Sequence, residues 1–240
     1  MTVLPYKEEE AGKKDQVAKM FNNISRHYDL LNHVLSLGID RSWRKKAIKI
    51  LKPLHPKHIL DVATGTGDFA LQAMELKPEK IMGIDISEGM LEIGRKKVSE
   101  RNLSSVIELQ RGDSENIQFA ENKFDAVTVG FGVRNFENLE SGLREIRRVM
   151  KPGALLVVLE FSRPRKFPFR QLYRFYFKLI LPKIGRLISK DRSAYTYLPE
   201  SVEAFPDGAD FENILKKVGF KETTCRPLTF GISSIYTAQK

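Results

Sequence analysis

A ten-residue stretch, residues 59–68, constrains the fold of this 240-residue chain more than any other part of its sequence. It begins as a short apolar run, reaches Asp61, passes through Gly65 and Gly67, and enters Phe69-Ala70-Leu71. An apolar strand, a tight glycine turn and the start of a helix, in that order, are typical of a Rossmann-type nucleotide turn. The stretch therefore predicts a sheet that binds a nucleotide-containing cofactor where its first strand ends.

Strand-like and helix-like segments alternate after this turn. The predicted strands are residues 58–62, 80–85, 106–109, 124–130 and 154–161, and the predicted helices are residues 68–75, 87–101, 138–150 and 210–218. Helical crossovers make successive strands parallel. The runs 220–228 and 230–238 are separated by Thr229 alone and predict an antiparallel hairpin. The predicted fold class is α/β and Rossmann-like, a mostly parallel seven-stranded sheet with an antiparallel C-terminal edge hairpin and helices on both faces.

The remaining segments complete a predicted single domain over residues 1–240. Residues 1–14 look like a loose tail, and helices are expected from Asp15 and from about Asp40 to Leu51. Residues 151–153, Lys-Pro-Gly, are expected to form a turn before the fifth strand. The predicted organisation is a helical substrate cap (1–52), a cofactor-binding core (53–161), a basic amphipathic insertion (162–206), and a C-terminal helix with the hairpin (207–240).

Composition limits the class of protein and its surroundings. The single cysteine, Cys225, excludes an intramolecular disulfide and thiolate metal clusters and agrees with the cytosol. The formal charge of +10 requires an anionic partner, which could be nucleic acid, a membrane surface or an acidic substrate.

Acids around the turn decide between two cofactors. The turn formally fits G-x-G-x-x-A, so a nicotinamide dinucleotide has to be considered. Against it, Asp68 would stand where a dinucleotide places its pyrophosphate, Asp61 adds a second acid at the end of the first strand, and Asp113 adds a third after the third strand. S-adenosyl-L-methionine carries a sulfonium and an ammonium group, which an acidic site suits. We therefore predict this cofactor.

Each predicted cofactor contact has a physical role. Asp85 can accept both ribose hydroxyls, and Asp113-Ser114 can reach the adenine amino group. Gly65 and Gly67 let the backbone approach the methionine portion closely, while Asp61 adds negative charge at the end of the first strand.

Three motifs then give the chain a family resemblance. They are Tyr28-Asp29-Leu30-Leu31-Asn32, Phe131-Gly132-Val133-Arg134-Asn135, and the run from Arg148 through Lys151-Pro152-Gly153 to Ser162. With these motifs the chain resembles the menaquinone and ubiquinone biosynthesis C-methyltransferases, from about Val17 to its C-terminus. It departs from the family's usual histidine at Asp40.

The resemblance implies an S-adenosylmethionine-dependent methyltransferase that methylates a ring carbon of demethylmenaquinol to give menaquinol. It also implies cofactor contacts at Thr64, Asp85, Asp113 and Ser114. Two alternatives stay open: C-methylation of a prenylated benzoquinol in ubiquinone biosynthesis, and methylation of RNA or another small molecule by the same cofactor domain.

Three residues are the predicted catalytic groups, and no metal is needed. Arg134 follows the fourth strand and, as a permanent cation, can hold the phenolate-like oxygen of a quinol, with Asn135 as an orienting partner. Tyr195 is the third, a quinol-contacting group together with Tyr28 and Tyr197. The competing interpretation of Arg134 is a structural salt bridge to an acid such as Glu137 or Asp125.

The excess charge is concentrated between the fifth strand and the last helix. Residues 163–192 carry one acid, Asp191, against ten basic residues: Arg163, Arg165, Lys166, Arg170, Arg174, Lys178, Lys183, Arg186, Lys190 and Arg192. A basic, aromatic, amphipathic segment suits an anionic membrane surface, as does a polyprenylated quinol substrate. We expect a cytoplasmic protein associated peripherally with the inner face of the cell membrane. RNA binding is the competing explanation, no nucleic acid is expected, and a homodimer stays open.

Overall fold

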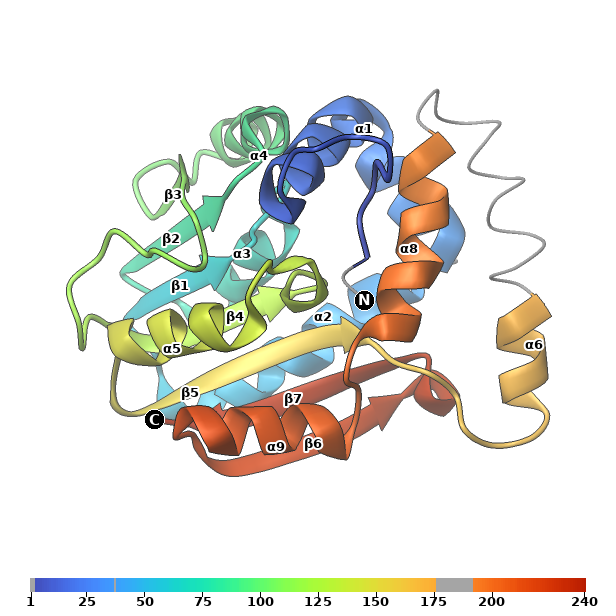
Figure 1. Cartoon of the computed structure of the whole chain (residues 1–240). Helices are drawn as coiled ribbons and strands as arrows, with labels where there is room; N and C mark the ends of the chain where they lie inside the picture. Colours follow the sequence, from blue (N-terminus) through green and yellow to red (C-terminus); the bar gives the residue numbers. More distant parts are fainter. Residues whose placement is uncertain (1–2, 37, 176–191) are drawn as a thin grey trace.

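The described residues are built around one mixed β-sheet. The computed structural model describes residues 3–36, 38–175 and 192–240, and within them the sheet has seven strands in the order β3-β2-β1-β4-β5-β7-β6 (Figure 1). The strands are β1 (His58–Val62), β2 (Lys80–Asp85), β3 (Ile107–Arg111), β4 (Phe124–Gly130), β5 (Met150–Phe161), β6 (Lys221–Leu228) and β7 (Ser233–Gln239). The first five are parallel, whereas β7 runs antiparallel to β5 and β6. The predicted fold class is confirmed.

Helices cover both faces of the sheet. One face carries α2 (Ile39–Leu51), α3 (Asp68–Ala73) and α4 (Glu88–Glu100), and the other carries α5 (Leu139–Val149) and α9 (Ala209–Val218). Short 3-10 turns are η1 (Lys52–Leu54), η2 (Met74–Leu76), η3 (Val133–Asn135) and η5 (Thr229–Gly231). Ser87 caps α4 and Asn138 caps α5, because each side chain accepts a backbone N–H three residues later. The two apolar layers hold the strand ends in fixed positions.

A cap of two helices lies over the carboxyl end of the sheet (Figure 1). It consists of α1 (Lys13–Ser36) and α8 (Arg192–Ala204), which bury Val17, Met20 and Ile24 against Ala194 and Tyr197. The short helix α6 (Phe169–Phe175) follows β5. Part of the predicted insertion therefore joins α1 in the cap, whereas α2, which the prediction included in the cap, packs on a face of the sheet. Residues 176–191 lie outside the described residues.

The structure corrects two predictions near the N-terminus. Residues 3–12 are not a loose tail, because Pro5 is buried, Tyr6 donates its N–H to Gln16 and Lys7 pairs with Glu200 of α8. The first helix begins at Lys13, two residues before the expected Asp15, and continues to Ser36, since no proline or glycine interrupts the chain before Gly38.

The predicted turn at residues 151–153 belongs instead to an irregular start of β5. Phe124 pairs with Met150, but Ala126 pairs with Leu155, so β5 carries extra residues there. Gly153 has φ 78, a left-handed conformation that glycine adopts without strain. The predicted strand 154–161 is the regular part of β5.

We predict that Gly132→Ala destabilises the protein. A Cβ at this position would lie 2.5 Å from the Cβ of Ala63, in the turn after β1, and 3.2 Å from Val129. Neither neighbour has a flexible end that can move away, so the loss should be about 1–3 kcal/mol in chemical denaturation. The control is Gly12→Ala, whose new methyl would meet only the Glu137 side chain and should change stability by less than about 0.5 kcal/mol. Equal midpoints for both variants would contradict the close packing of the two turns.

Candidate functional site

A first hollow lies at the carboxyl end of β1 to β4, where ligands bind in open parallel sheets. Its volume is about 650 Å³. Residues that follow four different strands line it: Gly65 after β1, Asp85 at the end of β2, residues 112–114 after β3 and Phe131 after β4. Of the predicted cofactor residues, Gly65, Asp85, Asp113 and Ser114 therefore share one cavity.

Asp85 is fixed in this hollow by two backbone groups. Its Oδ2 accepts the N–H of Gly65 at 2.8 Å, and its Oδ1 accepts the N–H of Ser87 at 2.9 Å. Burial raises the pKa of Asp85, while the backbone N–H groups act in the opposite direction. The carboxylate is thus held rigidly between the turn after β1 and the start of α4, with acceptor lone pairs to spare for a ligand.

Asp113 links the hollow to the cap. Its Oδ2 lies 2.7 Å from Nζ of Lys14 on α1, and its Oδ1 accepts the N–H of Glu115 at 2.9 Å. Lys14, Val17, Phe21 and Tyr28 of α1 also line the first hollow. The N-terminal helix therefore forms one wall of the cavity.

Three predicted cofactor residues, Asp61, Thr64 and Gly67, do not line the hollow and lie behind its wall. Asp61 is fully buried and accepts the hydroxyls of Thr64 at 2.6 Å and Thr128 at 2.7 Å. Desolvation raises the pKa of Asp61 to about 6. Gly67 begins α3 with φ 78 and packs towards Leu109. These residues shape the turn from beneath.

Asp68 begins α3, as expected, but its carboxylate does not line the first hollow. Its carboxylate lies 2.7 Å from Nζ of Lys97 and 3.4 Å from Arg44, and it lines a separate polar hollow together with Asp29. Lys97 and Arg44 therefore balance the negative charge of Asp68 outside the first hollow.

A second, largely apolar hollow adjoins the first. It has a volume of about 720 Å³ and lies under the cap. Its apolar lining comes from α1, β5 and α8, and its polar lining consists of Tyr28, Ser36, Asp40, Arg44, Arg134 and Tyr197. Phe21, Tyr28 and Phe131 line both hollows. The two hollows therefore share part of their walls.

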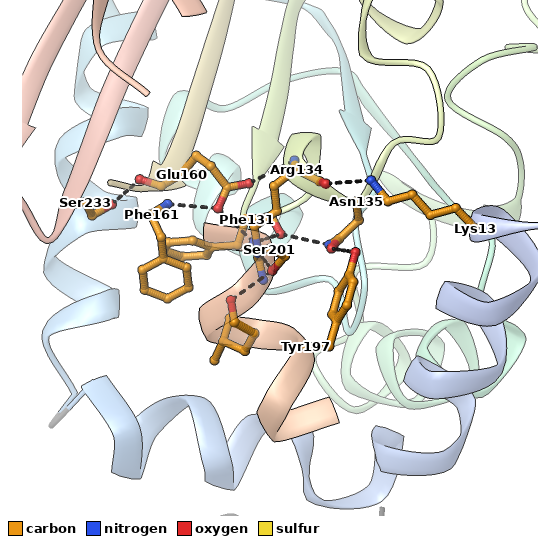
Figure 2. A network of polar contacts seen from close by, with 10 residues as sticks. Lys13, Phe131, Arg134, Asn135, Glu160, Phe161, Tyr197, Ser201 and Ser233 are labelled. Carbon is orange, nitrogen blue, oxygen red and sulfur yellow. Dashed lines mark hydrogen bonds and ion pairs between the residues drawn. The ribbon is translucent and has the colours of Figure 1, made fainter. Parts of the chain in front are cut away.

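Arg134 stands in the wall of the second hollow, paired with a buried acid. Its Nη1 lies 2.7 Å from Oε1 of Glu160, and its Nε donates to Ser201 of α8 at 3.3 Å (Figure 2). The Arg134 side chain is 7% exposed and that of Glu160 is fully buried. Burial raises the pKa of Glu160, whereas the Arg134 charge lowers it. The salt bridge considered for Arg134 thus exists, but its partner is Glu160 and neither Glu137 nor Asp125.

The turn that carries Arg134 is tied to both cap helices. Asn135 lines the first hollow, and its Oδ1 accepts the hydroxyl of Tyr197 at 3.1 Å. Lys13 of α1 donates to the carbonyl oxygen of Arg134 at 3.0 Å (Figure 2) and to that of Phe136 at 2.7 Å. Burial raises the pKa of Tyr197 to about 12, so its hydroxyl stays protonated at neutral pH.

The side chain of Tyr195, the third predicted catalytic residue, lies outside the described residues, as do those of Asn32 and His33.

Sequence reasoning missed several groups at this site. Glu160 is a single acid in an apolar strand, and that contrast is the signal that could have found it. Ala63 and Phe131 adopt φ 53 and φ 57, a conformation that non-glycine residues seldom take and that clusters at functional sites. Asp40 accepts the hydroxyl of Ser36 at 2.6 Å and pairs with Arg44, which adds polar groups to the second hollow.

None of the helices formed by residues 3–36, 38–175 and 192–240 is both long and apolar enough to cross a membrane.

The chain is similar to known methyltransferases both in sequence and in fold. Residues 9–240 match the model of the ubiE/COQ5 methyltransferase family. A demethylmenaquinone methyltransferase from Bacteroides fragilis is 53% identical over 99% of this chain and 97% of its own length. A ubiquinone/menaquinone biosynthesis C-methyltransferase from Geotalea daltonii is 47% identical over 95% of this chain and 97% of its own. A solved S-adenosylmethionine-dependent methyltransferase from Thermotoga maritima shares the fold, with a TM-score of 0.63, 19% identity, and coverage of 92% of this chain and 99% of that one.

We predict that Asp61 makes the stability of the protein depend on pH. Its folded-state pKa of about 6 lies above the ordinary value of 3.8, so the folded protein binds this proton more tightly than the unfolded chain. The free energy of unfolding should therefore fall by about 3 kcal/mol as the pH rises from about 4 to about 6. In Asp61→Asn, which keeps an acceptor for a threonine hydroxyl, this fall should disappear from urea denaturation curves. An identical pH dependence in both proteins would contradict the burial of a titrating Asp61.

Proposed function

Because the chain belongs to the ubiE/COQ5 methyltransferase family, we propose that it transfers a methyl group from S-adenosyl-L-methionine to a ring carbon of a prenylated quinol, with demethylmenaquinol as the acceptor. The methyl donor agrees with the family and with the fold, and the sequence-based prediction of this cofactor is confirmed. The choice of acceptor rests on the second hollow, a largely apolar cavity with the guanidinium of Arg134 in its wall. This cavity shares Phe21, Tyr28 and Phe131 with the first hollow.

The first hollow fits the cofactor. Asp85, immobilised by two backbone N–H groups, offers a carboxylate for the ribose hydroxyls, and Asp113-Ser114 offers acceptors for the adenine end. Gly65 has φ 55 and no atom within 4 Å of the place where a Cβ would stand, which leaves room for a ligand beside the backbone. When bound there, S-adenosyl-L-methionine supplies an electrophilic methyl group on a sulfonium. In this proposal Asp61, Thr64 and Gly67 position the turn and do not touch the cofactor.

Arg134 holds the acceptor oxygen in the proposed reaction. A quinol ring attacks through carbon when an adjacent hydroxyl loses its proton, so a group that stabilises the developing phenolate lowers the barrier. The guanidinium of an arginine is a permanent cation, and Glu160 with Ser201 holds that of Arg134 in one orientation. Because the remaining lining is mostly apolar, this hydrogen bond acts in surroundings with little competing water.

Asn135 and the tyrosines align the reactants. Asn135 lines the first hollow while bonded to Tyr197, which lines the second, so this pair connects the two cavities. Tyr28 faces both. We keep Tyr195 as a further contact to the quinol, on the basis of its position in α8. Holding the two reactants in one fixed geometry is a major part of catalysis when no metal takes part.

The proposed acceptor also accounts for the basic charge of the chain. A polyprenyl tail resides in lipid, and residues 163–175 carry five basic residues and no acid, as expected for a segment that meets an anionic membrane. We therefore propose a cytoplasmic enzyme that associates peripherally with the inner membrane face. A prenylated benzoquinol is the second candidate acceptor, because the relative from Geotalea daltonii is named for both quinones.

The test is methyl transfer from labelled S-adenosyl-L-methionine to short-tailed demethylmenaquinol and demethylated benzoquinol under reducing conditions. We expect label in the naphthoquinol, less in the benzoquinol, and none in the oxidised quinone, whose ring lacks the hydroxyl that activates the carbon. Total RNA serves as the control for the competing substrate class. Label in RNA with none in either quinol would refute the proposed function.

A further inference from the structure

Four large apolar side chains are exposed where two separate segments of the described chain meet. Phe167, Leu172 and Phe175, in α6 or just before it, are 80%, 60% and 57% exposed, and Phe230 in η5 is 66% exposed. Phe169, at the start of α6, stacks on Phe230 with ring centroids 3.8 Å apart and planes 4° apart. We call Phe167, Leu172, Phe175 and Phe230 the apolar patch. Contiguous exposed apolar groups of this kind mark interaction surfaces.

The hairpin tip presents Phe230 in a fixed and costly conformation. Thr229, Phe230 and Gly231 all have positive φ, at 42°, 59° and 93°, although two of them are not glycine. The tip is nevertheless held on both sides, because Trp43 donates its indole N–H to the Thr229 hydroxyl and Ser162 donates to the Gly231 carbonyl, each at 2.8 Å. The exposed ring is thus displayed by a braced turn, in a conformation that asparagine or glycine would adopt with less strain.

Basic residues alternate with the patch residues along residues 163–175. Arg165, Lys166 and Arg170 are exposed, and the described residues 163–175 contain no acid. Helix α6 points Tyr173 inward, against the cluster formed by α1 and α8, while Leu172 and Phe175 stay exposed. Apolar side chains with neighbouring cations are the combination that binds the interface of an anionic bilayer.

The patch lies beside the second hollow. Since Phe161 at the end of β5 pairs with Ser233 at the start of β7, the hairpin tip lies at the carboxyl edge of the sheet, next to α6 (Figure 1). Phe161 lines the second hollow, and the next residue, Ser162, lines the groove under Phe167 and Phe230. A molecule that left the bilayer at the patch would be next to the proposed acceptor site.

We propose that the apolar patch is a docking surface that inserts into the headgroup region of an anionic bilayer and turns the mouth of the second hollow towards the lipid. This inference rests on the proposed function, because a polyprenylated acceptor is dissolved in that bilayer. The hairpin tip and α6 insert side chains, and Arg165, Lys166 and Arg170 meet the lipid phosphates.

The test uses flotation of the full chain with vesicles of phosphatidylcholine, with and without phosphatidylglycerol. We expect binding to the anionic vesicles, and a loss of about tenfold or more in Phe230→Asn and in the double variant Leu172→Gln/Phe175→Gln, because each removes a large apolar side chain from the contact. The control is Leu54→Gln in η1. Leu54 is 47% exposed and lies before β1, at the amino-terminal end of the parallel strands and away from the patch. Thermal unfolding should show that Phe230→Asn stays folded. Asparagine adopts the positive φ of this position with less strain, which offsets the lost ring stacking on Phe169.

Activity on a short-tailed, water-soluble quinol separates this inference from the proposed function. The patch variants should methylate it at the wild-type rate while failing to bind vesicles. Vesicle binding equal to wild type in both patch variants would overturn the docking surface, as would patch-dependent binding of RNA without binding of vesicles. If the wild type binds vesicles through the patch but methylates no quinol, the docking surface stands and the proposed function falls.

Discussion

The arrangement of the site depends on one buried ion pair, Arg134 with Glu160. A fully buried carboxylate costs several kcal/mol unless it is paired and hydrogen-bonded, and Glu160 meets that condition through Arg134 and through the backbone N–H of Phe161 at 2.8 Å. The pair joins the end of β5 to the turn η3, and Ser201 extends the contact to α8. The ion pair therefore links β5, η3 and α8. It also orients the guanidinium of Arg134, which with Arg44 is one of two among the described residues that line the second hollow.

Two aspartates at neighbouring strand ends show how the same residue type takes different roles. Asp61 lies beneath the turn, is bonded to two threonine hydroxyls, and has its pKa raised to about 6. Asp85 is also buried, but it borders the first hollow and is bonded to backbone N–H groups that hold the turn open for a ligand. One carboxylate stabilises the shape of the turn and the other faces the cavity. The acids near the glycines led to the correct cofactor, although only some of them line the first hollow, since Asp61 and Asp68 do not.

The sheet could be predicted from the sequence because its strands are short apolar runs bounded by glycine, proline or capping residues, so 58–62, 80–85 and 124–130 match β1, β2 and β4 in full. The periodicity of apolar residues predicted less about the site, because contacts between residues far apart in the sequence determine its geometry. Nothing local pairs Arg134 with Glu160, 26 residues away, or brings Lys14 to Asp113, 99 residues away. The exposed Phe230 could not be foreseen either, because the sequence placed it in the apolar run 230–238, whereas it lies in the turn η5 before β7.

The most direct measurement compares cofactor affinity with methyl transfer in the double variant Arg134→Met/Glu160→Leu. Removing both charges leaves no unpaired buried ion, so this variant should stay folded, whereas Glu160→Leu alone should lose about 3–5 kcal/mol of stability. We expect wild-type affinity for S-adenosyl-L-methionine in calorimetry and a fall of about a hundredfold or more in kcat on reduced demethylmenaquinol. A double variant that binds the cofactor and turns over like the wild type would contradict the role assigned to Arg134.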